Sequence, residues 1–211
     1  MQFTIRPHQP TFDLILETGR YQRLWEQHGE AILQAFSNVT GLEFQQDVIT
    51  AEVFPDQGND SGGVGEAMHL SGMHPSEHRI LETLIHELAH RLLGGNALWA
   101  YELGLVAADA PEALHSEYNH RLIYLFLYDV MEQALGEPFA TVFKEREDND
   151  LLAPPDYRQA WQWAMSLNHD ERQQAVQRLA AQKFTRDRWH ERDADYEPPR
   201  RDAEAWFAHL L

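Results

Sequence analysis

The sequence predicts an α+β protein that is mostly helical and has a small N-terminal sheet. Residues 2–7 and 44–54 are rich in β-branched and aromatic residues and are short enough for strands. From residue 75 onward, apolar residues recur mainly at helical spacing. With 211 residues and 43% hydrophobic content the chain can bury an ample core, so residues 1–183 should form a single domain. Residues 184–211 should form a charged tail whose final helix docks on that domain.

The N-terminal part should alternate between strands and one helix. Residues 20–39 carry apolar side chains on one side of a predicted amphipathic helix. The strand predicted at 44–54 is followed by turn-forming residues at 55–65, which favour a flexible, hairpin-like connection. Residues 66–71 are then short enough for an edge strand leading into the next helix.

The central predicted helix covers residues 75–95. Ser76 can cap its start and Gly94-Gly95 can end it in a left-handed turn. A broad apolar stripe indicates that this helix packs into the core. The stripe consists of Ile80, Leu81, Leu84, Ile85, Leu88, Leu92 and Leu93.

The remaining sequence predicts further helices. Residues 112–136 are strongly apolar and predict one long core helix. Shorter helices are expected at 138–147, 157–167 and 171–183, and the terminal one at 203–211.

The central helix contains His86-Glu87-Leu88-Ala89-His90, an H-E-x-x-H sequence. Residues four apart lie on nearly the same face of a helix, so His86 and His90 can present two imidazoles to one metal ion. Glu87 lies too far round the helix to join them easily, but it can take a proton from a metal-bound water. This spacing predicts a zinc hydrolase with Glu87 as general base and His86 and His90 as metal ligands.

The order of strands and helix before H-E-x-x-H resembles that of the zincin metallopeptidases. The resemblance implies a zincin-like domain, one Zn²⁺ per chain and hydrolysis of peptide bonds in a peptide or protein substrate. It also implies that the strand just upstream binds extended peptide by strand addition, which makes residues 67–71 the candidate substrate strand.

The third metal ligand is open between several residues. The metzincin pattern would place a glycine at Leu93 and a histidine at Asn96, and neither matches. The gluzincin pattern needs a later glutamate, for which Glu117 is better placed than Glu102 or Glu112. His120 is the other candidate, because it borders a desolvated apolar stretch that favours neutral imidazole.

A second resemblance bears on His120. The segment Glu117-Tyr118-Asn119-His120-Arg121, followed by LIYLFLYDV, is similar to poorly characterised bacterial and phage zincin-like proteins. These proteins pair a HELxHRLL-type helix with a later Asn-His on an apolar helix. The expected metal ligands are therefore His86, His90 and His120, with Glu117 as the alternative third ligand. Tyr124, one turn beyond His120, is a candidate for stabilising an oxyanion.

Composition excludes several other classes. The net charge of −17 disfavours nucleic acid as a partner, because phosphate binding needs Lys and Arg on one face. Residues 1–120 hold 17 acidic and 5 basic side chains; this acidic first half would mildly attract cationic peptides, and its more general consequence is solubility. No apolar run is long enough for a membrane span, and the first residues lack a secretory signal pattern. The absence of cysteine rules out disulfides and thiolate metal sites and fits the cytoplasm.

An alternative function from another class is that of a protein that binds the metal but catalyses no reaction. It is a zinc-stabilised binding or regulatory protein that has either a blocked cleft or a fourth protein ligand, Glu117 or His115. A closed site with four protein ligands would favour this alternative, and an open coordination position would favour the enzyme.

Overall fold

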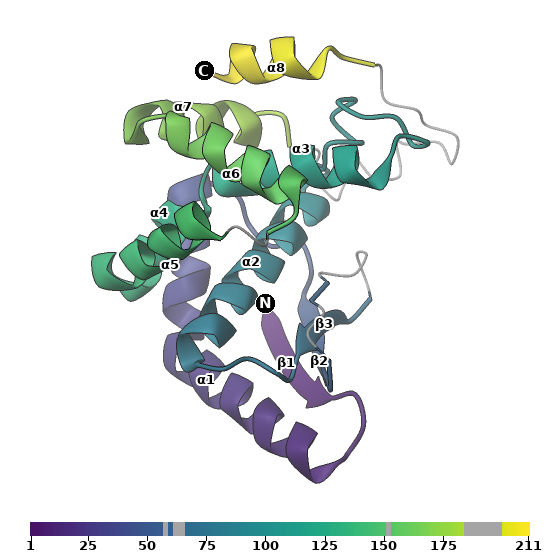
Figure 1. Ribbon diagram of the computed structural model, residues 1–211, viewed down its shortest axis with the longest axis vertical. Helices are drawn as coiled ribbons and strands as arrows, with labels where there is room; N and C mark the ends of the chain where they lie inside the picture. The colour runs from purple at the N-terminus through teal and green to yellow at the C-terminus, as the bar shows by residue number, and fades with distance from the viewer. Residues whose placement is uncertain (57–58, 61–65, 151–152, 184–199) are drawn as a thin grey trace.

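A computed structural model describes residues 1–56, 59–60, 66–150, 153–183 and 200–211. The described chain is mostly helical and has one small sheet, in agreement with the predicted α+β class (Figure 1). The expectation of a charged, loop-like tail falls largely on residues 184–199 and lies outside the described residues.

The sheet contains β1 (Gln2–Pro7), β2 (Val48–Phe54) and β3 (Met68–Ser71) in the order β1-β2-β3. The three predicted strands are confirmed, although β2 and β3 begin later than expected. Both neighbouring pairs are parallel. The hairpin-like connection predicted between β2 and β3 is therefore wrong, because a hairpin joins antiparallel strands and a parallel pair requires the chain to return along the strand.

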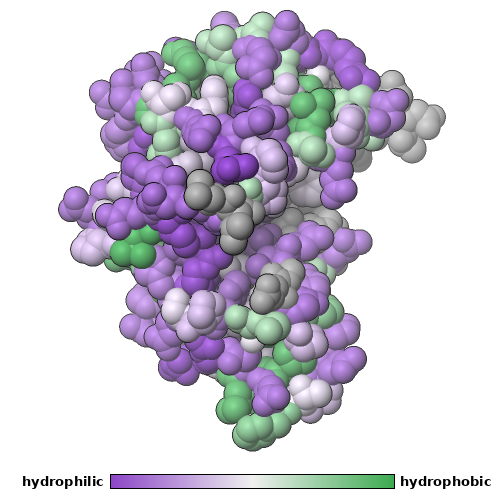
Figure 2. Space-filling model, viewed as in Figure 1, coloured by the Kyte–Doolittle hydropathy of each residue, from purple (hydrophilic) through white to green (hydrophobic). Residues whose placement is uncertain are grey.

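Helix α1 (Phe12–Thr40) is longer than the predicted 20–39 helix. It rises from the lower end of the molecule in Figure 1 and packs against β1 and the helix that follows β3. Its C-terminus is closed by Gly41, which has φ 65° and whose N–H donates to the Ser37 carbonyl. The middle of α1 buries its apolar side chains, whereas Phe12, Ile15 and Leu16 at its start are exposed. Figure 2 shows apolar surface at that lower end of the molecule, on a face that is otherwise mostly hydrophilic.

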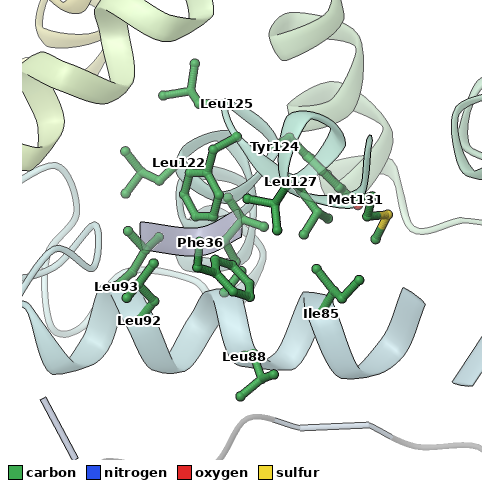
Figure 3. Close-up of a cluster of buried hydrophobic side chains, with 14 of the residues drawn as sticks. Phe36, Ile85, Leu88, Leu92, Leu93, Leu122, Tyr124, Leu125, Leu127 and Met131 are labelled. Atoms are coloured by element: carbon green, nitrogen blue, oxygen red, sulfur yellow. The ribbon is translucent and has the colours of Figure 1, made fainter. Parts of the chain in front are cut away.

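Helix α2 (Glu77–Gly95) packs against α1, β3 and the two helices that follow it in the chain. Its N-cap is Ser76, whose side chain accepts the Arg79 N–H, as predicted. Figure 3 shows Ile85 and Leu92 extending from α2 toward Phe36 of α1, while Leu88 points to the opposite side of the helix. All of these side chains are fully buried. Burial on both sides fixes the rotation of α2, and therefore fixes the direction in which its polar residues point.

The end of α2 differs from the prediction. Gly94 and Gly95 belong to the helix, and the positive φ, 54°, falls on Ala97 instead. A Cβ on Gly94 would lie 2.8 Å from the indole of Trp99, so this glycine permits close packing. The Trp99 Nε1–H in turn donates to the His90 carbonyl at 3.2 Å.

The single long helix predicted at 112–136 is also wrong. The chain forms α3 (Glu112–Tyr124) and α4 (Leu127–Leu135), with a break at Leu125 and Phe126. The Phe126 N–H bonds the Ile123 carbonyl three residues back, and Phe126 has φ −127°. Neither glycine nor proline is present at the break, so packing decides it: α4 turns to lie against α1, and α3 lies against α6.

The C-terminal half adds α5 (Glu137–Asn149), α6 (Pro155–Ser166) and α7 (His169–Ala180), close to the predicted positions. The terminal helix α8 (Ala203–Leu210) packs against α7 at the top of Figure 1 and buries Phe207 and Leu210. None of the described helices has the length and apolar character needed to cross a membrane.

Candidate metal centre

Three imidazoles meet where α2 faces α3. His86 and His90 come from consecutive turns of α2, and His120 comes from α3. The ring centroids lie 5.0 Å apart for His86 and His90, 5.2 Å for His86 and His120, and 5.1 Å for His90 and His120. One possible ligand atom from each residue lies within 4.8 Å of the other two. A single ion can therefore be reached by all three side chains.

The hydrogen bonding of His120 leaves one nitrogen for a metal. Its Nδ1 lies 2.7 Å from the Ser116 carbonyl, which can only accept, so Nδ1 carries the hydrogen. The Nε2 lone pair is then the available ligand atom. Within the described part of the chain this buried Nε2 has no hydrogen-bond partner. Because a buried polar atom without a partner is costly, the site fits a metal ion, and the backbone bond on the other nitrogen would fix the ring orientation.

The three imidazoles are held in the neutral, ligand form. Burial lowers the pKa of His86 and His90 well below the usual range, and repulsion among the three rings lowers both further. Burial likewise lowers the pKa of His120 to about 4, against a small opposing effect of the Ser116 carbonyl. At neutral pH these side chains do not need to lose a proton before they bind a metal.

Glu87 lies beside the histidines and is 6% exposed. It lines, with His86, a cavity of about 350 Å³ that opens to solvent. Burial, together with the charge of Asp60, raises the pKa of Glu87 to about 8, and Arg91 partly offsets this rise. A carboxyl group whose pKa lies near neutrality can both take and return a proton.

The far wall of the cavity is a network of ion pairs. Glu82, which is 3% exposed, accepts from Arg79 Nη1 at 2.7 Å and from Arg146 Nη2 at 3.0 Å. Arg146 Nη2 also lies 2.9 Å from Glu147 Oε1. The Tyr124 hydroxyl donates to Glu147 Oε2 at 3.3 Å. Tyr124 is therefore buried against this wall, and its hydroxyl is already bonded there.

The alternative third ligands lie elsewhere. Glu117 accepts from Arg121 Nη2 at 2.6 Å, and Arg121 also bonds Glu204 of α8 at 2.9 Å and 3.1 Å. Asn96, at the metzincin position, donates its amide to the carbonyls of Leu92 and Glu43. Among the described residues the possible ligand group contains the three histidines and neither Glu117 nor His115.

Tyr157 is a site residue that the sequence analysis missed. Its ring centroid lies 3.8 Å from that of His120, and it lines the cavity with His86 and Glu87. Its hydroxyl hydrogen-bonds the Ser116 side chain, and burial raises its pKa to about 12. No sequence signal links Tyr157 to the motif, because packing of α6 on α3 brings it there.

We expect His120→Ala to weaken zinc binding by more than about 100-fold, because it would remove a direct ligand. Glu117→Gln should change the affinity by less than about tenfold, since Glu117 bonds Arg121 and stays outside the cluster. Zinc titration against a chromogenic chelator measures both affinities. The reverse ranking would place Glu117 on the metal.

Comparisons of the chain with protein-family models, with curated proteins and with solved structures find no match.

Proposed function

We propose that this protein is a zinc-dependent hydrolase of peptide bonds, of the zincin-like kind. The observation that carries the proposal is the convergence of three neutral imidazoles, one with an unpartnered Nε2 within the described residues, beside a buried glutamate in an open cavity. Nitrogen ligands without thiolates suit zinc, and three protein ligands leave a coordination position for chemistry.

In the proposed reaction His86, His90 and His120 would hold the ion. When bound, zinc would supply Lewis-acid chemistry, lowering the pKa of water and polarising a carbonyl. Glu87 takes the proton of the attacking water and returns it to the leaving amine. Tyr157 lies against the His120 ring and limits its rotation.

An enzyme is favoured over a zinc-stabilised binding protein. A purely structural zinc site is usually closed by four protein ligands. The described residues offer three, and the ligand cluster borders a cavity large enough for part of a peptide. Glu87 also lies at the cavity, where a purely structural site has no use for a buried carboxyl group.

The proposed substrate is an extended peptide. The net charge of −17 would steer cationic peptides toward the protein, so a library of basic peptides is the first to test. Strand β3, next to α2, is the proposed docking strand.

We expect zinc-loaded protein to cleave members of such a library and denatured casein. Dialysis against a chelator should abolish cleavage, and about one equivalent of zinc should restore it. Mass spectrometry of the products measures the cleavage. If zinc binds with the expected stoichiometry and no peptide is cut, the binding-protein function is the better one.

A further inference from the structure

The outer edge of β3 borders the candidate metal centre. Strand β2 covers one edge of β3, and the other edge faces away from the sheet. Asn59, which lies along this outer edge, lines the same cavity as His86 and Glu87. A peptide added to this edge would therefore pass beside the metal ligands.

That edge is already paired with the chain itself. The Asp60 N–H donates to the His69 carbonyl at 2.9 Å, and the His69 N–H donates to the Asp60 carbonyl at 2.7 Å. This exchange of both bonds is that of an antiparallel strand pair. The Ser71 N–H donates to the Asn59 side-chain Oδ1 at 2.8 Å. Residues 59 and 60 thus make the bonds that an added peptide strand would make.

Little of the outer edge is left for another strand. Backbone groups alternate in direction along a strand, so His69 and Ser71 point outward while Met68 and Leu70 point to β2. The remaining outward group, the Ser71 carbonyl, accepts from the Tyr21 hydroxyl at 2.8 Å. A peptide can pair with this edge only where residues 59 and 60 have left it.

The pairing is of a kind that can be exchanged. Asn59 and Asp60 are both exposed, so few apolar contacts hold them in place. Asp56 makes further contacts with β3, through an ion pair with His69 Nε2 at 2.8 Å and through its carbonyl, which accepts from the Ser71 hydroxyl at 2.5 Å. When a peptide displaces residues 59 and 60, it can replace each hydrogen bond that these residues made to β3.

We propose that Asn59 and Asp60 occupy the docking edge of β3 as an intramolecular competitor of extended peptides. The inference rests on the proposed function, since it takes the peptide as substrate. The apparent affinity for peptide is then reduced by the fraction of molecules in which the edge is occupied. Residues 59 and 60 make about three hydrogen bonds to β3, so removing this competitor should tighten peptide binding roughly tenfold.

The test compares Asp60→Pro with Asp60→Ala. Proline has no N–H for the His69 carbonyl, whereas alanine keeps the backbone bonds and removes only the carboxylate. The probe is a short fluorescein-labelled Thr-Val repeat peptide, whose binding is followed by fluorescence anisotropy with and without zinc. We expect Asp60→Pro to bind it roughly tenfold more tightly than wild type, and more tightly than Asp60→Ala, which keeps the backbone bonds.

Asn59→Ala is the second variant, and it serves if Asp60→Pro does not fold. It removes the acceptor of the Ser71 N–H, so the Ser71 amide should exchange its hydrogen faster in the free protein and the probe should bind more tightly. Saturating probe should restore the slow exchange of the Ser71 amide in this variant, because the peptide replaces the lost bond.

Equal affinity of wild type, Asp60→Pro and Asn59→Ala for the probe would overturn the inference, as would probe binding that leaves the Ser71 amide unprotected. These measurements need neither zinc nor turnover. If zinc binding or peptide cleavage fails, the proposed function is wrong, but the competition at β3 can still be tested. If the variants bind the probe with the affinity of wild type while cleavage persists, the inference is wrong and the proposed function stands.

Discussion

Changing His86 and His90 together to alanine is expected to abolish zinc binding. Wild type should hold about one zinc per chain, because three imidazole ligands converge there. The double variant keeps only His120 of this set. Elemental analysis of purified protein by mass spectrometry measures the difference, with His28→Ala, on α1 and outside the cluster, as the matched control.

Thermal unfolding gives a second reading of the same change. Added zinc should raise the Tm of wild type, since a ligand at about 100 times its Kd stabilises the native state by about 2.7 kcal/mol. It should leave the Tm of the double variant unchanged. A double variant that still carries a full equivalent of zinc would show that the metal, if any, binds elsewhere.

Glu87→Gln should lower peptide cleavage by roughly 10²–10⁴-fold, the usual contribution of a positioned general base. Zinc content and Tm should remain those of wild type, because glutamine keeps the shape of the side chain and Glu87 lies outside the ligand group of the described residues. Loss of zinc in this variant would make Glu87 a structural residue, and unchanged cleavage would place the reaction at another site.

The pH profile of wild type should have an acidic limb that Glu87 controls. The base works only when deprotonated, so activity falls as the pH drops below its apparent pKa. Without a metal, burial and the charge of Asp60, partly offset by Arg91, raise the pKa of Glu87 to about 8. A neighbouring dication favours the carboxylate, so the limb should lie below that value. The group and the attacking water titrate as a coupled pair, and kcat/KM measured against pH reports their apparent values.

Local patterns in the sequence were sufficient for much of this fold. The hydroxyl of Ser76 and the apolar repeat behind it predicted α2, because a cap and a helical period are set by neighbouring residues. The spacing of His86 and His90 placed both imidazoles on one face for the same reason. The approximate positions of the three strands and the presence of helices after residue 136 also followed from local composition.

Other features depend on which elements pack together, and no local signal contains that. His120 and Glu117 lie within one turn of α3, and only the rotation of α3 against α2 and α6 directs His120 to the cluster and leaves Glu117 outside it. Tyr157 reaches His120 from α6 through the same packing.

Packing between elements also decided the local geometry of the chain at three places. The break at Leu125 and Phe126 arises because α4 turns onto α1, and Gly94 stays helical because Trp99 packs on it. The pairing of Asp60 with β3 follows from a parallel sheet that leaves that edge open. The sequence by itself determined most of the elements and the shared helix face of His86 and His90. The tertiary structure decided the remaining neighbours of the site, because contacts between distant residues depend on the burial of whole helix faces.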